Sequence, residues 1–233
     1  MKTHDVLCDS GVLISLTAGC MDNLLHFFAQ NYHLRFIIPP SVEYESVLRP
    51  LQSDLRKYLF SAIRIRNAMD DGVIVRVDAN VANRARRIME LANNLFYVRG
   101  NPMRLLQQGE CEILALARTV GVEYILIDER TTRVLVEAPL SLKDHLEKEF
   151  GVHVMVNKKN LKELTSEIAP LRAIRSSELV MLAYEKGFFR SFKKLEKDAL
   201  AAALYKMKYC GCSISFHEID HYLSWVAQTG GRS

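Results

Sequence analysis

Residues 6–16, VLCDSGVLISL, decide how this chain folds. The first three residues form a short apolar run that is typical of a buried strand, and the run stops at Asp9. The remaining residues favour a helix, with Ser10 near its N-cap. Asp9 is therefore expected at the C-terminal end of a strand, directly before a helix.

Two further apolar runs are expected to form strands. Residues 34–38, LRFII, end at a pair of prolines, and residues 124–127, YILI, end at Asp128. Because these runs are apolar on both faces and alternate with helical patterns, we predict an α/β fold with a central parallel sheet sandwiched by helices. Ligands of such sheets gather at the C-terminal ends of the strands, where Asp9 and Asp128 both fall.

The rest of the chain is predicted to be mainly helical. Helices are expected over residues 24–28, 51–69, 80–96, 109–121, 140–150, 161–168, 176–186, 193–208 and 216–227, with short strands over 73–75 and 152–156. This pattern divides the chain into an α/β unit, residues 1–138, and a mainly helical C-terminal region, residues 139–233, packed on the same domain. A basic helical insertion is expected within the α/β unit, at about residues 50–105.

The composition is that of an ordinary globular protein and excludes disorder, collagen and coiled coil. The chain has 233 residues, of which 49% are hydrophobic and 25% are charged. Its apolar runs are shorter than the roughly 18 residues that a membrane-spanning helix needs, so no membrane partner is expected. Asp9 interrupts the first apolar stretch, unlike a signal peptide, and the five scattered cysteines favour reduced thiols. We therefore expect a cytoplasmic protein.

Positive charge is concentrated in two stretches, although the net charge is only +4. Residues 49–104 contain eleven Arg or Lys against five acids, and residues 186–208 contain seven against two, with three phenylalanines among them. Two solvated helix faces would explain this pattern. Contacts to the phosphates of a nucleic acid would explain it as well.

Four acidic residues stand where an acid is unexpected. Asp9 and Asp128 follow buried strands, Glu45 lies on the helix after the proline pair, and Glu112 lies against an apolar helix stripe. Singly, each is explained as a helix cap, a turn residue or the partner of an arginine. Together they are expected to share a cation, because isolated buried carboxylates are costly. Oxygen ligands favour Mg²⁺ or Mn²⁺ over Zn²⁺.

Four segments, in order along the chain, resemble the successive motifs of PIN-domain ribonucleases. They are residues 9–16 (DSGVLISL), 37–45 (IIPPSVEYE), 109–117 (GECEILALA) and 125–133 (ILIDERTTR). The resemblance covers about residues 4–137. It implies a PIN-like parallel sheet in which one or two Mg²⁺ or Mn²⁺ ions are held by four catalytic acids, which match Asp9, Glu45, Glu112 and Asp128 in that order.

Two of these assignments have a close alternative. Glu43 and Glu45 lie two residues apart, and Glu45 is chosen because its position in the motif matches the spacing in the family. Glu112 is chosen over Glu110 because it directly precedes the apolar run; Glu110 then supports the site or caps the helix. Ser10 either donates a hydrogen bond within the site or only caps the first helix.

The resemblance implies a metal-dependent ribonuclease that hydrolyses RNA phosphodiester bonds, either in RNA processing or as a toxin. Single-stranded or looped RNA is the expected substrate, because its backbone can enter an open carboxylate pocket. The expected RNA contacts are Arg84, Arg86, Arg87, Arg130 and Arg133. Arg130 and Arg133 are equally suited to pairing with neighbouring carboxylates. Other implied partners are a second copy in a homodimer and a protein such as an antitoxin or a processing factor.

A non-catalytic RNA-binding or scaffolding protein on the same fold is the alternative, because the basic stretches suit it equally well. Glu112 follows Glu45 by 67 positions, more than compact family members need, which makes the toxin role less secure. A nucleotide-binding α/β domain also places an aspartate after a strand, but the chain has neither a G-x-G-x-x-G nor a G-x-x-x-x-G-K-[ST] loop.

Overall fold

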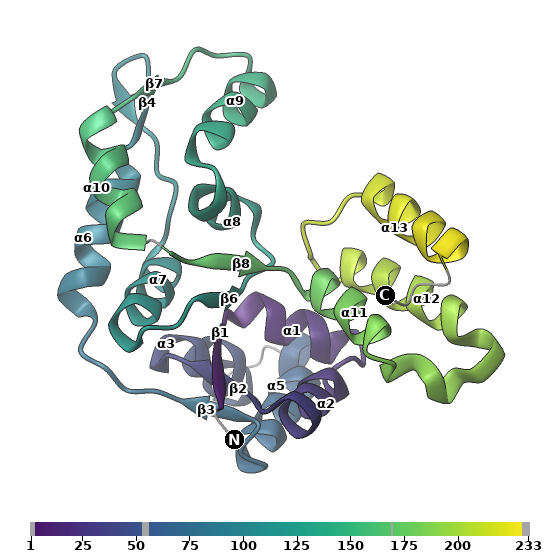
Figure 1. The fold of residues 1–233 in the computed structure, drawn as a ribbon. Helices are drawn as coiled ribbons and strands as arrows, with labels where there is room; N and C mark the ends of the chain where they lie inside the picture. Colours follow the sequence, from purple (N-terminus) through teal and green to yellow (C-terminus); the bar gives the residue numbers. More distant parts are fainter. Residues whose placement is uncertain (1–2, 53–55, 169, 230–233) are drawn as a thin grey trace.

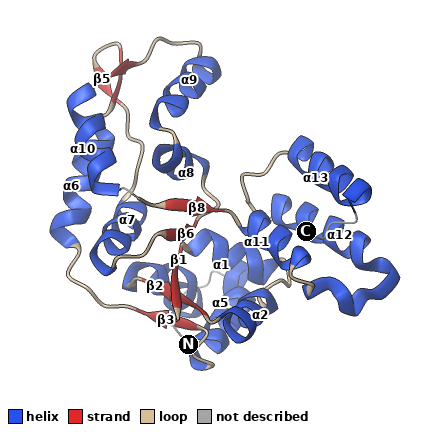
Figure 2. Ribbon diagram, viewed as in Figure 1, coloured by secondary structure: helices blue, strands red, loops and turns tan. Residues whose placement is uncertain are grey.

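The central element is a five-stranded parallel sheet with the order β3-β2-β1-β6-β8. The computed structural model describes all residues except 1–2, 53–55, 169 and 230–233. The strands are β1 (His4–Cys8), β2 (Leu34–Ile38), β3 (Ile74–Arg76), β6 (Tyr124–Leu126) and β8 (Arg172–Ile174). Helices cover both faces of this sheet (Figures 1 and 2), which confirms the predicted α/β fold.

The helices form two layers around the sheet. The N-terminal helices are α1 (Ser10–Ala18), α2 (Asn23–Tyr32), α3 (Pro40–Glu43), the π-helix η1 (Tyr44–Leu48), α4 (Arg49–Gln52) and α5 (Arg56–Asp70). The middle ones are α6 (Ala82–Asn93), α7 (Gln108–Val120), α8 (Arg130–Glu137), α9 (Pro139–Phe150) and α10 (Lys158–Ile168). The C-terminal ones are α11 (Ser176–Glu185), the 3₁₀ helix η2 (Phe188–Leu195), α12 (Glu196–Tyr209) and α13 (Phe216–Thr229). Helix α1 contacts α5 and α11, whereas α7 contacts α3, α6 and α10.

Several element boundaries differ from the predictions. The helix expected over residues 80–96 ends at Asn93 and is followed by β4 (Phe96–Val98), which pairs antiparallel with β5 (Asn101–Pro102) and β7 (Met155–Val156). The helix expected from residue 193 begins at Glu196, because Lys193 has a non-helical backbone with φ of 54°. The helix expected over residues 51–69 includes residues 53–55, which lie outside the described residues. These differences fall at short elements, where sequence periodicity is weak.

Of the two outer strands of the sheet, β3 confirms the strand expected at residues 73–75, whereas β8 comes from a region that was expected to be mainly helical. Strand β3 lies within residues 50–105, and β8 lies within the C-terminal region. Strand β8 pairs with β6, and Ile127 N donates to Ile174 O at 2.9 Å just beyond the strand. The C-terminal region thus contributes a strand to the sheet whose C-terminal edge carries the acids. The division into two regions at residue 138 stays a prediction.

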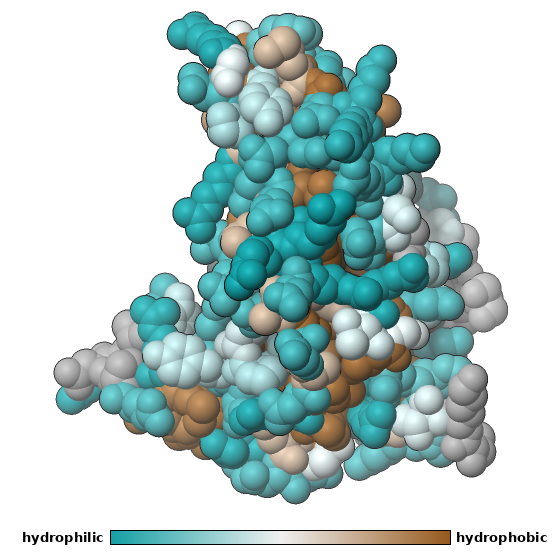
Figure 3. Space-filling view, turned by 90° about the vertical axis from the view of Figure 1, so that its left-hand side faces the viewer, coloured by the Kyte–Doolittle hydropathy of each residue, from teal (hydrophilic) through white to brown (hydrophobic). Residues whose placement is uncertain are grey.

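Helices α6 and α10 together form a mostly hydrophilic outer face (Figure 3). Arg87 of α6 pairs there with Glu163 of α10, and Arg84 Nε lies 4.0 Å from Glu167 Oε2.

Within the described residues, no single helix is long and apolar enough to cross a membrane; α1 and α2 reach that threshold only as a pair bent by 110°.

Candidate functional site

Asp9 lies where the sequence predicts it, between the end of β1 and the start of α1. Its backbone N–H donates to Leu126 O at 3.0 Å, which ties it to the end of the neighbouring strand β6. Its Oδ2 accepts from Gly11 N at 3.2 Å and caps α1. A Cβ at residue 11 would lie 3.0 Å from that carboxylate oxygen, so the absence of a side chain leaves room for it. Asp9 is thereby held at the C-terminal edge of the sheet.

The pKa of Asp9 is raised from 3.8 to about 7. Burial of the carboxylate is the main cause, and the negative charges of Glu110 and Glu45 raise it further. Hydrogen bonds from the backbone of Gly11 and Ser10 lower it, but they do not compensate. The ionised form of Asp9 therefore lacks a cation, and a positive charge at this position would stabilise it.

Glu45 reaches the site from η1. Ser10 Oγ donates to Glu45 Oε2 at 2.9 Å, and a Cβ on Gly109 would lie 3.5 Å from Glu45 Oε1. Glu45 is exposed, whereas Glu43 is buried and accepts from Arg76 Nη1 at 3.0 Å. Of these two glutamates, Glu45 is thus the one that faces the acids.

The start of α7 places Glu110 and Glu112 in different surroundings. Glu110 Oε2 accepts from Gln107 N at 2.8 Å in a capping box, and its charge acts on Asp9. Glu112 Oε1 accepts from Gln108 Nε2 at 2.8 Å and lines a cavity against α6, together with Arg86. Residues two apart on an α-helix differ in direction by about 200°, so both cannot face the same site.

Asp128 is almost completely buried, with 3% of its surface exposed. Its Oδ1 accepts from Ser176 N and its Oδ2 from Ser176 Oγ, both at 2.8 Å. Its carbonyl oxygen accepts from Ser213 N at 3.2 Å. Ser176 begins α11, and no signal in the sequence connects it with an aspartate 48 residues earlier. The C-terminal helices thus hold the last acid in place.

Asp9 and Asp128 line one cavity of about 330 Å³. The other lining residues come from α1, α5 and the turns after β6 and α12: Gly11, Ile14, Ser15, Tyr58, Glu129, Cys210 and Gly211. Glu45 and Glu110 are not among the lining residues.

The predicted RNA contacts fall into two groups. Arg84 and Arg87 pair with glutamates of α10, and Arg133 Nη1 lies 3.1 Å from Glu137 Oε2. Arg86 and Arg130 are exposed and form no ion pair with any residue that the structure describes. Arg130 directly follows the acidic turn at Asp128, so it is the best placed of the five to contact a phosphate near the acids.

The arrangement fits a hard divalent cation by its chemistry, but not as a ready-made cage. Carboxylate oxygens are the donors that Mg²⁺ and Mn²⁺ prefer, and the charges of Glu110 and Glu45 add to burial in raising the pKa of Asp9. Across residues 3–52, 56–168 and 170–229, however, no three His, Cys, Asp or Glu side chains are close enough together to hold a metal ion. Shared coordination therefore requires these carboxylates to rotate toward one another.

Comparisons of this chain with protein-family models, with curated proteins and with solved structures found no match.

Proposed function

We propose that this protein is a metal-dependent ribonuclease of the PIN-domain type, which hydrolyses RNA phosphodiester bonds at the C-terminal edge of its sheet. One observation carries the proposal: the charges of Glu45 and Glu110 act on Asp9, which shares a cavity with Asp128. Helix capping accounts for Asp9 and Glu110 singly, but it does not account for the convergence of acids from β1, η1 and α7. A cation-dependent reaction accounts for that convergence.

The chain's own residues have separable roles in this proposal. Asp9, Glu45, Glu110 and Asp128 supply oxygen ligands, with Glu110 in the place that the sequence resemblance assigns to Glu112. Mg²⁺ or Mn²⁺ in this position supplies charge neutralisation at the phosphodiester and a more acidic water. Ser10 orients Glu45, and Ser176 orients Asp128, each through a hydrogen bond of 2.8–2.9 Å.

Arg130 would hold a phosphate next to the acids, and Arg86 would contact a more distant one. Such contacts depend on charge and bind a nucleic acid strand with little sequence preference. The five cysteines are free, as expected of a cytoplasmic protein, and action on cytoplasmic RNA is part of the proposal. A homodimer, an antitoxin and a processing factor stay predictions as partners.

Cleavage of labelled RNA tests the proposal. Purified protein is incubated with 5′-labelled single-stranded, hairpin and duplex RNA in Mn²⁺, Mg²⁺ or EDTA. We expect cleavage of unpaired RNA that needs the cation and that falls to background in Asp9→Asn and Asp128→Asn. Cleavage that persists in both variants would show that the activity comes from a contaminant or from another site.

Glu110→Gln and Glu112→Gln form a matched pair, because the same change is made two residues apart on one helix. The proposal expects Glu110→Gln to lose cleavage and Glu112→Gln to keep it. The reverse result would restore the assignment of Glu112.

A non-catalytic RNA-binding protein is the second candidate. It is favoured by the absence, among the described residues, of three acids close enough to hold a cation. Tight RNA binding without cleavage in any cation would establish this candidate instead.

A further inference from the structure

Two aromatic side chains lie exposed beside the acidic cavity, at the junction of α12 and α13. Tyr209 ends α12 with 74% of its surface exposed, and Phe216 begins α13 with 48% exposed. Their ring centroids are 6.1 Å apart, and Tyr205 adds a third ring 6.2 Å from Phe216. Large rings left this open to water form an apolar surface that no other part of the described chain covers.

The turn between these helices is tied to the acids. Cys210 and Gly211, which directly follow Tyr209, line the cavity together with Asp9 and Asp128. Ser15 Oγ donates to Cys210 O at 3.2 Å, and Ser213 N donates to Asp128 O at 3.2 Å. The aromatic pair therefore has a fixed position relative to the strand-end carboxylates.

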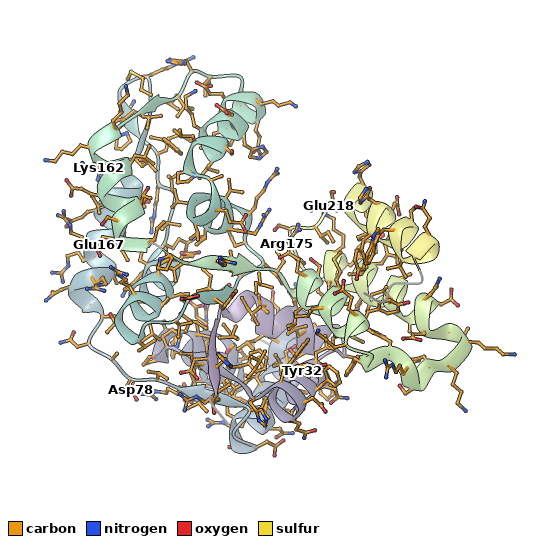
Figure 4. The ribbon with its side chains drawn as sticks, in the orientation of Figure 1. Tyr32, Asp78, Lys162, Glu167, Arg175 and Glu218 are labelled. Carbon is orange, nitrogen blue, oxygen red and sulfur yellow. The ribbon has the colours of Figure 1, made fainter. Side chains whose placement is uncertain are left out.

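A buried arginine fixes the other side of this turn. Arg175 Nη1 donates to Ser213 O at 3.3 Å and to Glu218 Oε1 at 2.9 Å, and only 9% of its side chain is exposed. Figure 4 shows Arg175 just beyond the end of β8 and Glu218 on α13. These hydrogen bonds fix the turn and the first residues of α13 to the end of β8.

Positive charge accompanies the rings. Lys208 Nζ lies 5.6 Å from the ring centroid of Phe216, and the charge of Lys206 acts on Cys210 at the rim of the cavity. Two acids are also near: Glu218 pairs with Arg175, and Asp220 accepts from Tyr205 Oη at 2.9 Å. Exposed rings with cations beside them are the combination that holds unpaired nucleobases and their phosphates.

We infer that Tyr209 and Phe216 form a stacking platform for an unpaired nucleobase of the RNA strand whose backbone enters the cavity. Lys206 and Lys208 contact the phosphates that flank this base. This inference rests on the proposed ribonuclease function and deepens it, because it requires an unpaired base next to the cleaved bond. Base-paired RNA is excluded from the platform, since its bases are already stacked on one another.

A binding assay without cleavage tests the platform. Fluorescein-labelled 12-nucleotide single-stranded RNA is titrated with protein in EDTA, beside an abasic strand of the same length and charge. Tyr209→Leu and Phe216→Leu retain apolar packing but remove the π-face. Each is expected to weaken binding of the single-stranded RNA by about 5- to 100-fold and to leave the abasic strand unaffected.

Phe150→Leu is the matched control, because Phe150 is 57% exposed but ends α9, outside both basic stretches and the α12–α13 turn. It should bind both strands like the wild type, and circular dichroism should show all three variants folded. Equal binding by the wild type and both platform variants would overturn the inference. An equal loss of binding to the abasic strand would also overturn it. No RNA binding by the wild type would overturn it too, and would indicate that the rings bind a protein partner.

The assay separates this inference from the proposed function. If the wild type cleaves RNA in Mn²⁺ while Phe216→Leu binds like the wild type, the platform is wrong and the nuclease stands. If the variants lose base-dependent binding while the wild type cleaves nothing in Mn²⁺ or Mg²⁺, the platform holds and the nuclease fails.

Discussion

The raised pKa of Asp9 predicts how folding stability depends on pH, and this dependence can be measured without a substrate. Asp9→Asn removes the charge but keeps a side chain that caps a helix equally well and can still accept from Gly11 N. The substitution therefore isolates the cost of burying a negative charge, to which the charges of Glu110 and Glu45 add.

The sign of the effect follows from the two pKa values of Asp9. Between pH 3.8 and about 7 the unfolded chain has lost a proton that the folded chain keeps, so stability falls as pH rises. Above pH 7 both states are ionised and the whole penalty is present. About three pH units correspond to about 4 kcal/mol. Because Asp9 is only partly buried, we expect Asp9→Asn to be about 2 to 4 kcal/mol more stable than wild type at pH 8.

Urea unfolding in EDTA, followed by circular dichroism and by the fluorescence of Trp225, measures this difference. At pH 4 the two proteins should unfold at closely similar urea concentrations, and the gap should open steadily up to pH 8. Asp144→Asn is the control, since 77% of the Asp144 side chain is exposed, and it should change stability by less than about 0.5 kcal/mol at either pH. An Asp9→Asn protein that is less stable than wild type at pH 8, or a gap independent of pH, would refute the raised pKa of Asp9.

Three further predictions follow from named contacts. Ser176→Ala removes the hydroxyl that donates to Asp128 Oδ2 and leaves the backbone N–H that donates to Oδ1. It should lower Mn²⁺ affinity or cleavage by about 10- to 100-fold; Ser177→Ala, one residue along α11, is the control in the same titration. Arg175→Met leaves Glu178 and Glu218 without their cation and should lower the free energy of unfolding, measured in urea, by about 1 to 3 kcal/mol. The control Arg35→Met, at an exposed pair with Asp5, should lower it by less than about 1 kcal/mol. Equal losses would show that the buried Arg175 pairs stabilise the fold no more than an exposed pair does. Mn²⁺ must compete with the proton on Asp9, so its apparent affinity should fall by about tenfold per pH unit below pH 7, and calorimetric titrations that show no such slope in the wild type would contradict this.

The fold and the strand-end acids could be predicted because they follow from local patterns. Apolar runs that stop at Asp9 and Asp128 identify buried parallel strands, and the pairing of β1 with β6 brings their ends together. Strand β8 could not be predicted in this way, since it has only three residues and is defined by its pairing with β6. Ser176 begins α11 shortly after β8, so its contact with Asp128 also depends on the pairing of β8 with β6, and no local pattern in the sequence predicts it.

The choice between Glu110 and Glu112 shows a different limit. The sequence places both at the start of an apolar helix, but the direction each one faces depends on how that helix is rotated against the sheet. Packing of α7 against α6 and α10 determines that rotation, and it leaves Glu112 beside Arg86 and Glu110 near Asp9. Such contacts between distant segments are not encoded in the spacing of one motif.

In the proposed function, one divalent cation is bound by acids at the C-terminal edge of the sheet. Anomalous diffraction from Mn²⁺-soaked crystals tests this binding, because the peak identifies the ligands without an assay of activity. We expect a peak with carboxylate oxygens of Asp9 and Asp128 at about 2.2 Å, with Glu45 or Glu110 beside them. A peak held by Glu112 in the α6–α7 cavity, or no peak at this edge in saturating Mn²⁺, would contradict it.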